Sequence, residues 1–189
     1  LFASPNCTPW GANARQWAAT KRQLKRSGET KWLQFLTMLC FMQILMGRSY
    51  IIENPAGSAI FDDKADSDLY KLKQPEMPYT VNRLDQCMFG AALEGQAIRK
   101  ATEFISNETL TAMQAQCDGG HVHLHLQGRN ERELRTAQAA VFPDKLCTAT
   151  LEEAQRIAST QNGGSICINL GSYFDRKSKE ETLSILMSE

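Results

Sequence analysis

The sequence has no net charge, because 21 Lys and Arg residues are balanced by 21 Asp and Glu residues. A chain without an overall field is not generally attracted to nucleic acid, so such binding must come from a local patch of charge. The sequence also lacks an uninterrupted apolar run of the length that a membrane-spanning helix needs. We therefore expect no membrane association.

Closely spaced cysteine pairs are also missing. The chain has six Cys but no Cys-x-x-Cys motif, and no signal peptide is recognisable. Scattered thiols of this kind indicate reduced cysteines and an intracellular setting, with nucleus and cytoplasm both open. The first residue is Leu rather than Met, so we expect the chain to be part of a larger polypeptide.

The composition is that of a globular protein, with 42% hydrophobic and 22% charged residues in a chain of 189. This length suits one domain with a real core, and no internal repeat is visible. We divide the chain into a main portion, residues 1–147, and a C-terminal extension of helix and strand, residues 148–189. In the extension we expect a strand at residues 165–170 and an exposed, highly charged tail at 175–181.

The first fifty residues predict a strand, a helical region and a second strand. A short apolar run at residues 1–3 reads as the end of a strand, and residues 48–52 read as another. Residues 16–26 and 31–46 have the composition of helices. Strand, helix and strand in succession are typical of a parallel α/β sheet.

The apolar helix at residues 31–46 has recognisable ends. Thr30 is a candidate N-cap and Gly47 a natural stop. Since only three polar residues interrupt it, we expect its Met and aromatic side chains to lie in the core.

The rest of the chain alternates between short elements. We expect a loop at residues 56–78, strands at 79–84 and 102–105, and helices at 135–146 and 151–159. In the last of these helices the residues expected on the polar side are Glu152, Glu153 and Arg156.

A thiol and a carboxylate stand at the ends of the two predicted N-terminal strands. Cys7 lies on a turn where Pro5 restricts the backbone, and Glu53 directly follows the second apolar run. Parallel strands end at one edge of a sheet, so the two groups can lie together. A thiolate that adds to C6 of cytosine makes C5 nucleophilic, and an acid at N3 assists the addition. The alternative is that Cys7 is a small buried hydrophobe and that residues 53–55 form an ordinary turn.

Residues 4–7 (Ser-Pro-Asn-Cys) and 53–55 (Glu-Asn-Pro) resemble the Pro-Cys and Glu-Asn-Val motifs of DNA cytosine-5 methyltransferases. Looser matches follow in order at residues 85–90, 99–107 and 135–143. The combination is most similar to the methyltransferase-like segments carried by phages and by mobile-element, retrotransposon-type polyproteins. It covers residues 1–147.

The resemblance implies an α/β protein with part of a Rossmann-like sheet of the S-adenosylmethionine-dependent methyltransferase type. The family's cofactor-binding strands precede the Cys motif, so this sheet would lack them, and the chain would be a fragment or degenerate in isolation. The implied reaction is transfer of a methyl group from S-adenosylmethionine to cytosine in DNA. The implied catalytic residues are Cys7, Glu53 and Arg99, and the implied substrate-binding residues are Pro5, Asn6, Asn54, Pro55 and Thr102.

A local basic segment follows the Cys motif, with six basic residues and one acid between Arg15 and Lys31. On a loop that closes over a base, Arg15 and its neighbours would bind DNA phosphates, and Trp10 or Trp17 would fill the space near an extruded base. The alternative is a helix whose charges only face water. A non-catalytic nucleic-acid-binding module is thus a second hypothesis for the function.

The three His of the protein lie at residues 121, 123 and 125, close behind Cys117. On a strand, alternate residues face the same side, so the three imidazoles would share one face. Cys117, His121 and His123 are candidate zinc ligands, with Cys87 or Cys147 needed to complete the set. The alternative is that the imidazoles only hydrogen-bond to one another. A metal-stabilised module of a polyprotein is therefore a third hypothesis.

Overall fold

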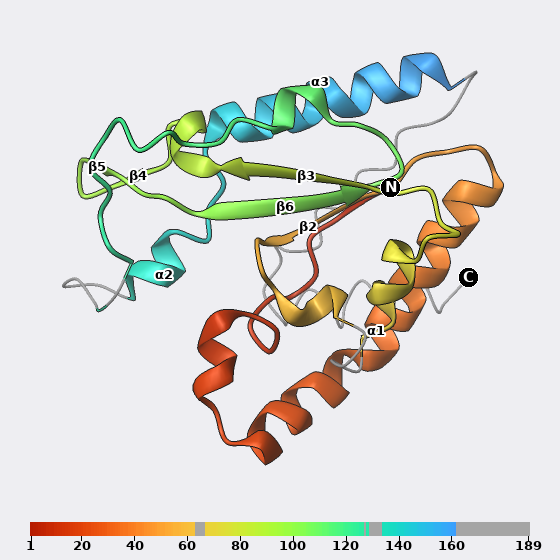
Figure 1. Ribbon diagram of the computed structural model, residues 1–189, viewed down its shortest axis with the longest axis horizontal. Coiled ribbons are helices and arrows are strands. Elements are labelled where there is room, and N and C mark those ends of the chain that lie inside the picture. The colour runs from red at the N-terminus through yellow and green to blue at the C-terminus, as the bar shows by residue number, and fades with distance from the viewer. Residues whose placement is uncertain (63–66, 127, 129–133, 162–189) are drawn as a thin grey trace, which may run out of the picture.

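A computed structural model describes residues 1–62, 67–126, 128 and 134–161 (Figure 1). The protein is a mixed α/β structure in which a small sheet lies between two helical layers. Helix α1 (Ala19–Leu45) covers one face of the sheet, and helix α3 (Asp144–Thr160) covers the other.

The sheet has four strands in the order β1-β2-β6-β3. β1 (Phe2–Ala3) runs parallel to β2 (Ile51–Pro55), whereas β6 (Ala101–Ser106) is antiparallel to both β2 and β3 (Thr80–Asp85). The predicted strand, helix and strand unit is therefore confirmed. The second strand begins later than predicted and continues to Pro55, because its whole length pairs with β6.

Alternating side chains on the central strands supply two separate cores. Ile51 and Phe104 point into the cluster that includes α3, whereas Ile52 and Ile105 point into the cluster that includes α1. This alternation is the period-two geometry of a strand that is buried on both faces. All four side chains are at most 4% exposed.

α1 is a single helix of 27 residues, so the prediction of two helices separated at Thr30 was wrong. Thr30 is not a cap but donates a hydrogen bond from its hydroxyl to the Arg26 carbonyl within the helix. One glycine inside a helix, Gly28, costs only about 1 kcal/mol, which packing of the flanking turns readily exceeds. The predicted stop is confirmed, since Gly47 has a φ of 64° and its N–H donates to the Ile44 carbonyl.

Only one side of α1 is buried, contrary to the prediction for its Met and aromatic residues. Leu33, Leu36 and Cys40 pack into the core at 1% exposure or less. A helix on the outside of a sheet can bury only one stripe. The exposed apolar residues on its other side are Leu24, Trp32, Phe35, Met38, Met42 and Leu45. Among the described residues, no helix is both long and apolar enough to cross a bilayer.

The described residues of the segment predicted as a loop after β2 include two short 3-10 helices, η2 (Ala59–Phe61) and η4 (Asp68–Lys73). Both begin after a serine whose hydroxyl accepts a backbone N–H, which the composition-based prediction overlooked. They bury Ile60, Leu69 and Leu72 against α1. This packing extends the α1 side of the core.

The second half of the chain builds the other helical layer. The strands predicted at 79–84 and 102–105 are confirmed as β3 and β6. The helix predicted at 135–146 is divided, because Pro143 caps α3, and the helix predicted at 151–159 belongs to α3. The predictions for residues 165–170 and 175–181 lie outside the described residues. The remaining elements are η1 (Ala12–Gln16), η5 (Gln86–Phe89), β4 (Ala92–Leu93), β5 (Gln96–Ala97), η6 (Thr111–Met113) and α2 (Arg135–Gln138).

The side chain of Glu153 connects α3 to η6. It is buried, so the prediction that it lies on the polar side of the helix was wrong. Its carboxylate accepts hydrogen bonds from the Thr111 hydroxyl at 3.0 Å and the Ala112 N–H at 2.6 Å, and it pairs with Arg156 at 2.7 Å. Burial favours the neutral acid, but these three donors outweigh it and lower the pKa of Glu153.

Glu153→Ala should therefore destabilise the protein by about 2–4 kcal/mol, because it leaves buried donors unsatisfied. Urea unfolding measures the loss of unfolding free energy. Glu152→Ala, which changes the exposed neighbouring glutamate, is the control. Since the pKa of Glu153 is lowered in the folded state, its contribution is present above the ordinary carboxyl pKa and is lost as the pH falls through the folded value. Equal stability of the two variants at pH 7 would contradict this role.

Candidate active site and metal cluster

The Cys7 turn projects from the end of β1 and is fixed by its own backbone. The Cys7 carbonyl accepts hydrogen bonds from the N–H groups of Trp10 and Gly11, at 3.0 and 2.8 Å. Arg26 of α1 donates to the Pro9 carbonyl at 3.1 Å and lies over the Trp10 ring. The thiol of Cys7 is half-buried on a turn that is tied to the long helix.

Two hydrogen bonds join this turn to the end of β2. The Ser4 hydroxyl donates to the Glu53 carboxylate at 2.5 Å, and the Asn54 side-chain amide donates to the Pro5 carbonyl at 3.0 Å. The expectation that the two motifs meet at one edge of the sheet is thus confirmed. Glu53 and Asn54 are buried, and the Asn54 Oδ1 accepts no hydrogen bond from the described residues.

The charge of Glu53 affects the protonation of Cys7. Burial raises the pKa of Glu53, against the opposing effects of the Ser4 hydrogen bond and the charge of Lys100. Burial also raises the pKa of Cys7, and the charge of Glu53 raises it further, whereas Lys100 lowers it. A buried carboxyl with a raised pKa is suited to donate a proton or a hydrogen bond.

Lys100 is the cation that acts on this pair, and the sequence did not single it out as a site residue. It precedes Ala101, whose carbonyl accepts the Ala56 N–H at the end of β2. Its ammonium also lies 5.3 Å from the Phe142 ring centre. Of the pair of adjacent basic residues, Arg99 was predicted to be catalytic. In the structure Arg99 pairs with Asp85 at 3.1 Å. The strand register that gives Arg99 and Lys100 different surroundings could not be fixed from the sequence.

The predicted substrate-binding residues lie in different surroundings. Thr102 is fully buried and accepts a hydrogen bond from the Gln86 side chain at 2.9 Å. Arg15 is exposed on η1. Trp10, predicted near an extruded base, is a core residue at 1% exposure, because it packs in the α1-side core and Arg26 lies over its ring.

A shallow pocket of about 310 Å³ opens beside the Cys7 turn. Asn6 and Thr8, which flank Cys7, line the pocket on the side of the turn. Trp17, just after η1, and Lys25 of α1 also line the pocket. Asn6 also donates to Glu29 of α1 at 3.0 Å. The wall of the pocket is thus made by the turn and by the first half of α1.

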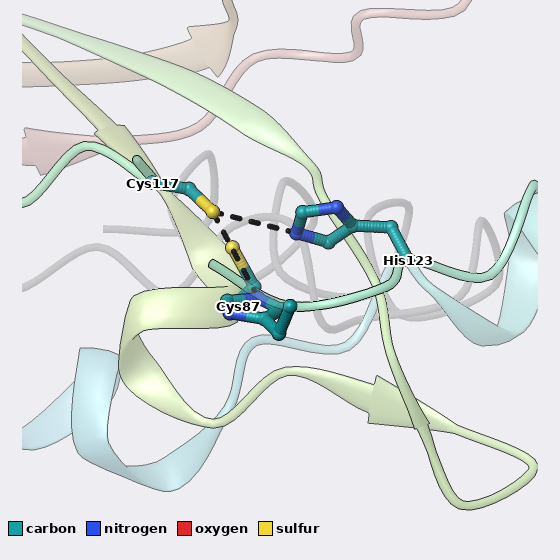
Figure 2. Close-up of side chains that lie close together, drawn as sticks. Cys87, Cys117 and His123 are labelled. Carbon is teal, nitrogen blue, oxygen red and sulfur yellow. Dashed lines mark hydrogen bonds between the residues drawn. The ribbon is translucent and has the colours of Figure 1, made fainter. Parts of the chain in front are cut away.

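The second site is a cluster of two cysteines and two histidines (Figure 2). The ligand atoms of Cys87, Cys117, His121 and His123 all lie within 4.8 Å of one another, so this cluster could hold a metal ion. Cys117 Sγ is 3.5 Å from His123 Nε2 and 3.8 Å from His121 Nε2. Figure 2 shows the labelled side chains turned toward one another from separate segments of chain.

Cys87 completes the cluster, and the histidines lie on a loop rather than on the predicted strand. Only one isolated bridge, between His123 and Ala97, has strand geometry there. Without a continuous strand the third imidazole is not aligned, so His125 is exposed and outside the cluster. Cys147, the other candidate partner, is exposed on α3.

No family model, curated protein or solved structure matches this chain. An activity must therefore be inferred from the chemistry of the Cys7–Glu53 pair and of the cysteine–histidine cluster.

The raised pKa of Glu53 predicts a stabilising substitution. A carboxyl whose pKa is raised by folding contributes most stability below its unfolded pKa and loses it as the pH rises through the folded value. Glu53→Gln, which stays neutral, should therefore be more stable than the wild type at pH 8, by roughly 1 kcal/mol, with no difference near pH 4. Denaturant midpoints across this range measure it, with Glu152→Gln as an exposed control. A less stable Glu53→Gln protein at pH 8 would contradict the assignment.

Proposed function

We propose that this chain is the nucleophile-bearing portion of a DNA cytosine-5 methyltransferase-type protein. The observation that carries the proposal is the junction of the two motifs, where Ser4 and Asn54 join the Cys7 turn to Glu53. A thiol and a buried acid in electrostatic contact are the two groups that covalent activation of cytosine requires. Lys100 supplies the positive charge that favours the thiolate.

In the proposed reaction the Cys7 sulfur forms a bond to C6 of cytosine while the Glu53 carboxyl protonates N3. The ring electrons then make C5 nucleophilic. After substitution at C5, the N3 proton returns to Glu53 and water takes the C5 proton. The electrons of the C5–H bond form the C5–C6 double bond and expel the thiolate as the C6–S bond breaks, which restores the aromatic ring. S-adenosylmethionine would supply the methyl group, as the resemblance to the family implies.

The architecture supports the same proposal. β1, α1 and β2 form the parallel unit from which a Rossmann-like sheet is built. Within the described chain, β1 pairs on one side only, with β2, and cofactor-binding strands would extend the sheet from its other side. We infer a partial Rossmann-like sheet on this basis.

DNA is the proposed partner. Arg15, Lys25 and Lys31 are exposed along η1 and α1, and Lys25 lines the pocket beside the Cys7 turn. They can neutralise phosphates, whereas Arg26 has a structural role against Trp10. If Cys7 were not catalytic, the same residues would leave a nucleic-acid-binding module as the alternative function.

Exchange at C5 tests the nucleophile without any cofactor. Reversible addition of Cys7 to C6 should let the C5 proton of cytosine in a DNA duplex exchange with deuterium, and the exchange should fall by at least about 100-fold in Cys7→Ser. Cys147→Ser, which removes an exposed thiol, is the matched control and should retain the wild-type rate.

A longer polypeptide that supplies a cofactor-binding half should also form a Cys7-dependent covalent adduct with 5-fluorocytosine DNA and S-adenosylmethionine. Absence of both exchange and adduct, with DNA binding intact, would leave the binding module as the function.

We further propose that the cysteine–histidine cluster binds zinc. In a tetrahedral site with Zn–S of 2.3 Å and Zn–N of about 2.0 Å, sulfur and nitrogen ligands are separated by about 3.6 Å. The two Cys117-to-histidine distances, 3.5 and 3.8 Å, match that separation. Four protein ligands leave no open position, which is the arrangement of a structural ion.

Zinc binding predicts one equivalent of metal per chain and a cobalt-substituted form with the absorption of a tetrahedral thiolate site. Free zinc at a thousand times its Kd should stabilise the protein by about 4 kcal/mol. Cys117→Ser and His123→Ala should lose the metal, whereas His125→Ala should retain it, because His125 lies outside the cluster. Equal zinc content in all three variants would contradict the site.

A further inference from the structure

The segment that carries Lys100 is attached to the cysteine–histidine cluster at three points. On one side, the Leu124 N–H donates to the Ala97 carbonyl at 2.8 Å, next to the ligand His123. On the other, the Gln86 N–H donates to the Lys100 carbonyl at 3.1 Å, next to the ligand Cys87.

The third attachment passes through Asp85. One carboxylate oxygen accepts the N–H of the ligand Cys117 at 2.9 Å, and the other accepts the Arg99 side chain at 3.1 Å. Asp85 also pairs with Ala101 across the sheet. Residues 97–102, which include Lys100, are therefore held by contacts with residues at or next to three of the four cluster residues, namely Cys87, Cys117 and His123.

Lys100 stands close to the end of β2, and its ammonium lies 5.3 Å from the Phe142 ring centre. Its backbone stands one residue before the contact between Ala101 and the end of β2. Its charge acts on both members of the pair, lowering the pKa of each, and Glu53 is the other charged group that acts on Cys7. The lysine stem is long and flexible, so a fixed backbone narrows the range of positions that its ammonium can reach.

We propose that a metal ion in the cysteine–histidine cluster holds Lys100 beside the Cys7–Glu53 pair, so that occupancy of the metal site sets the reactivity of Cys7. The inference rests on the proposed zinc site and on the proposed role of Cys7. Lys100 is then a positioning residue for the thiolate, and the ion acts on it through the backbone of residues 97–102.

The test is the rate at which iodoacetamide alkylates Cys7, measured from pH 7 to 10 and assigned to Cys7 by peptide mass spectrometry. In zinc-loaded protein, Lys100→Met should slow alkylation at pH 8 by about three- to tenfold, equivalent to a rise of up to one unit in the pKa of Cys7. Lys100→Arg should restore the rate. Lys71→Met, which removes a lysine paired with Asp68, is the control and should leave it unchanged.

Removal of zinc decides whether the two sites are coupled. Wild-type protein without zinc should react at the rate of zinc-loaded Lys100→Met, and the substitution should then have no further effect. If Lys100→Met slows the reaction equally with and without zinc, or not at all with zinc, the inference is overturned. A protein that binds no zinc overturns it too, together with the zinc proposal.

If circular dichroism shows that the protein unfolds when zinc is removed, Cys7 alkylation in zinc-loaded Asp85→Asn becomes the deciding measurement. This variant keeps all four ligands but removes the charge that joins Arg99 to Cys117. In zinc-loaded protein it should slow Cys7 alkylation toward the Lys100→Met rate, and a wild-type rate would overturn the inference. Failure of the methyltransferase proposal is distinguishable, since it appears as absent C5 exchange rather than as a change in Cys7 alkylation.

Discussion

The parallel pairing of β1 with β2 is the constraint on which the arrangement of the candidate active site depends. β1 has only two residues, and its register with β2 aligns Phe2 with Ile51 and Ala3 with Ile52. β1 then ends opposite Ile52, so the turn that follows it runs beside the polar residues Glu53 and Asn54 of β2. A shift of one residue would exchange the faces of these strands and separate the two motifs.

The same edge concentrates groups that work against stability. Glu53 and Asn54 are buried, and one oxygen of Asn54 has no hydrogen-bond partner among the described residues. Buried polar groups of this kind are costly unless they are satisfied, and proteins retain them mainly at functional sites. By contrast, Glu153 is buried with a full set of donors, as is typical of a structural carboxylate. The contrast between the two glutamates supports a chemical role for Glu53.

Local patterns predicted the strand–helix–strand unit, β3, β6 and the stop at Gly47, because these depend on apolar runs and turn residues. They did not predict which side of α1 is buried, since Met38 and Met42 are as apolar as the core leucines. Only the sheet decides which stripe it covers. The sequence also placed Cys117, His121 and His123 as candidate ligands, but not whether Cys87 or Cys147 completes the set. Cys87 completes the set because η5 packs near the loop that carries Cys117 and the histidines, about thirty residues later in the chain, and local sequence does not predict this contact. Local patterns also could not show that Arg99 pairs with Asp85 while Lys100 acts on the Cys7–Glu53 pair, because this depends on the register of the strands.

The length of α1 has a mechanical consequence. A helix of 27 residues is about 40 Å long, whereas strands of five or six residues span about 20 Å, so much of the helix extends beyond the sheet. Its first half is fastened to the Cys7 turn through Arg26 and Glu29, while its second half is embedded in the core. α1 thus links the Cys7 turn mechanically to the core. Any displacement of its first half would act on the Cys7 turn through Arg26 and Glu29, and it would also press on the core residue Trp10, over which Arg26 lies.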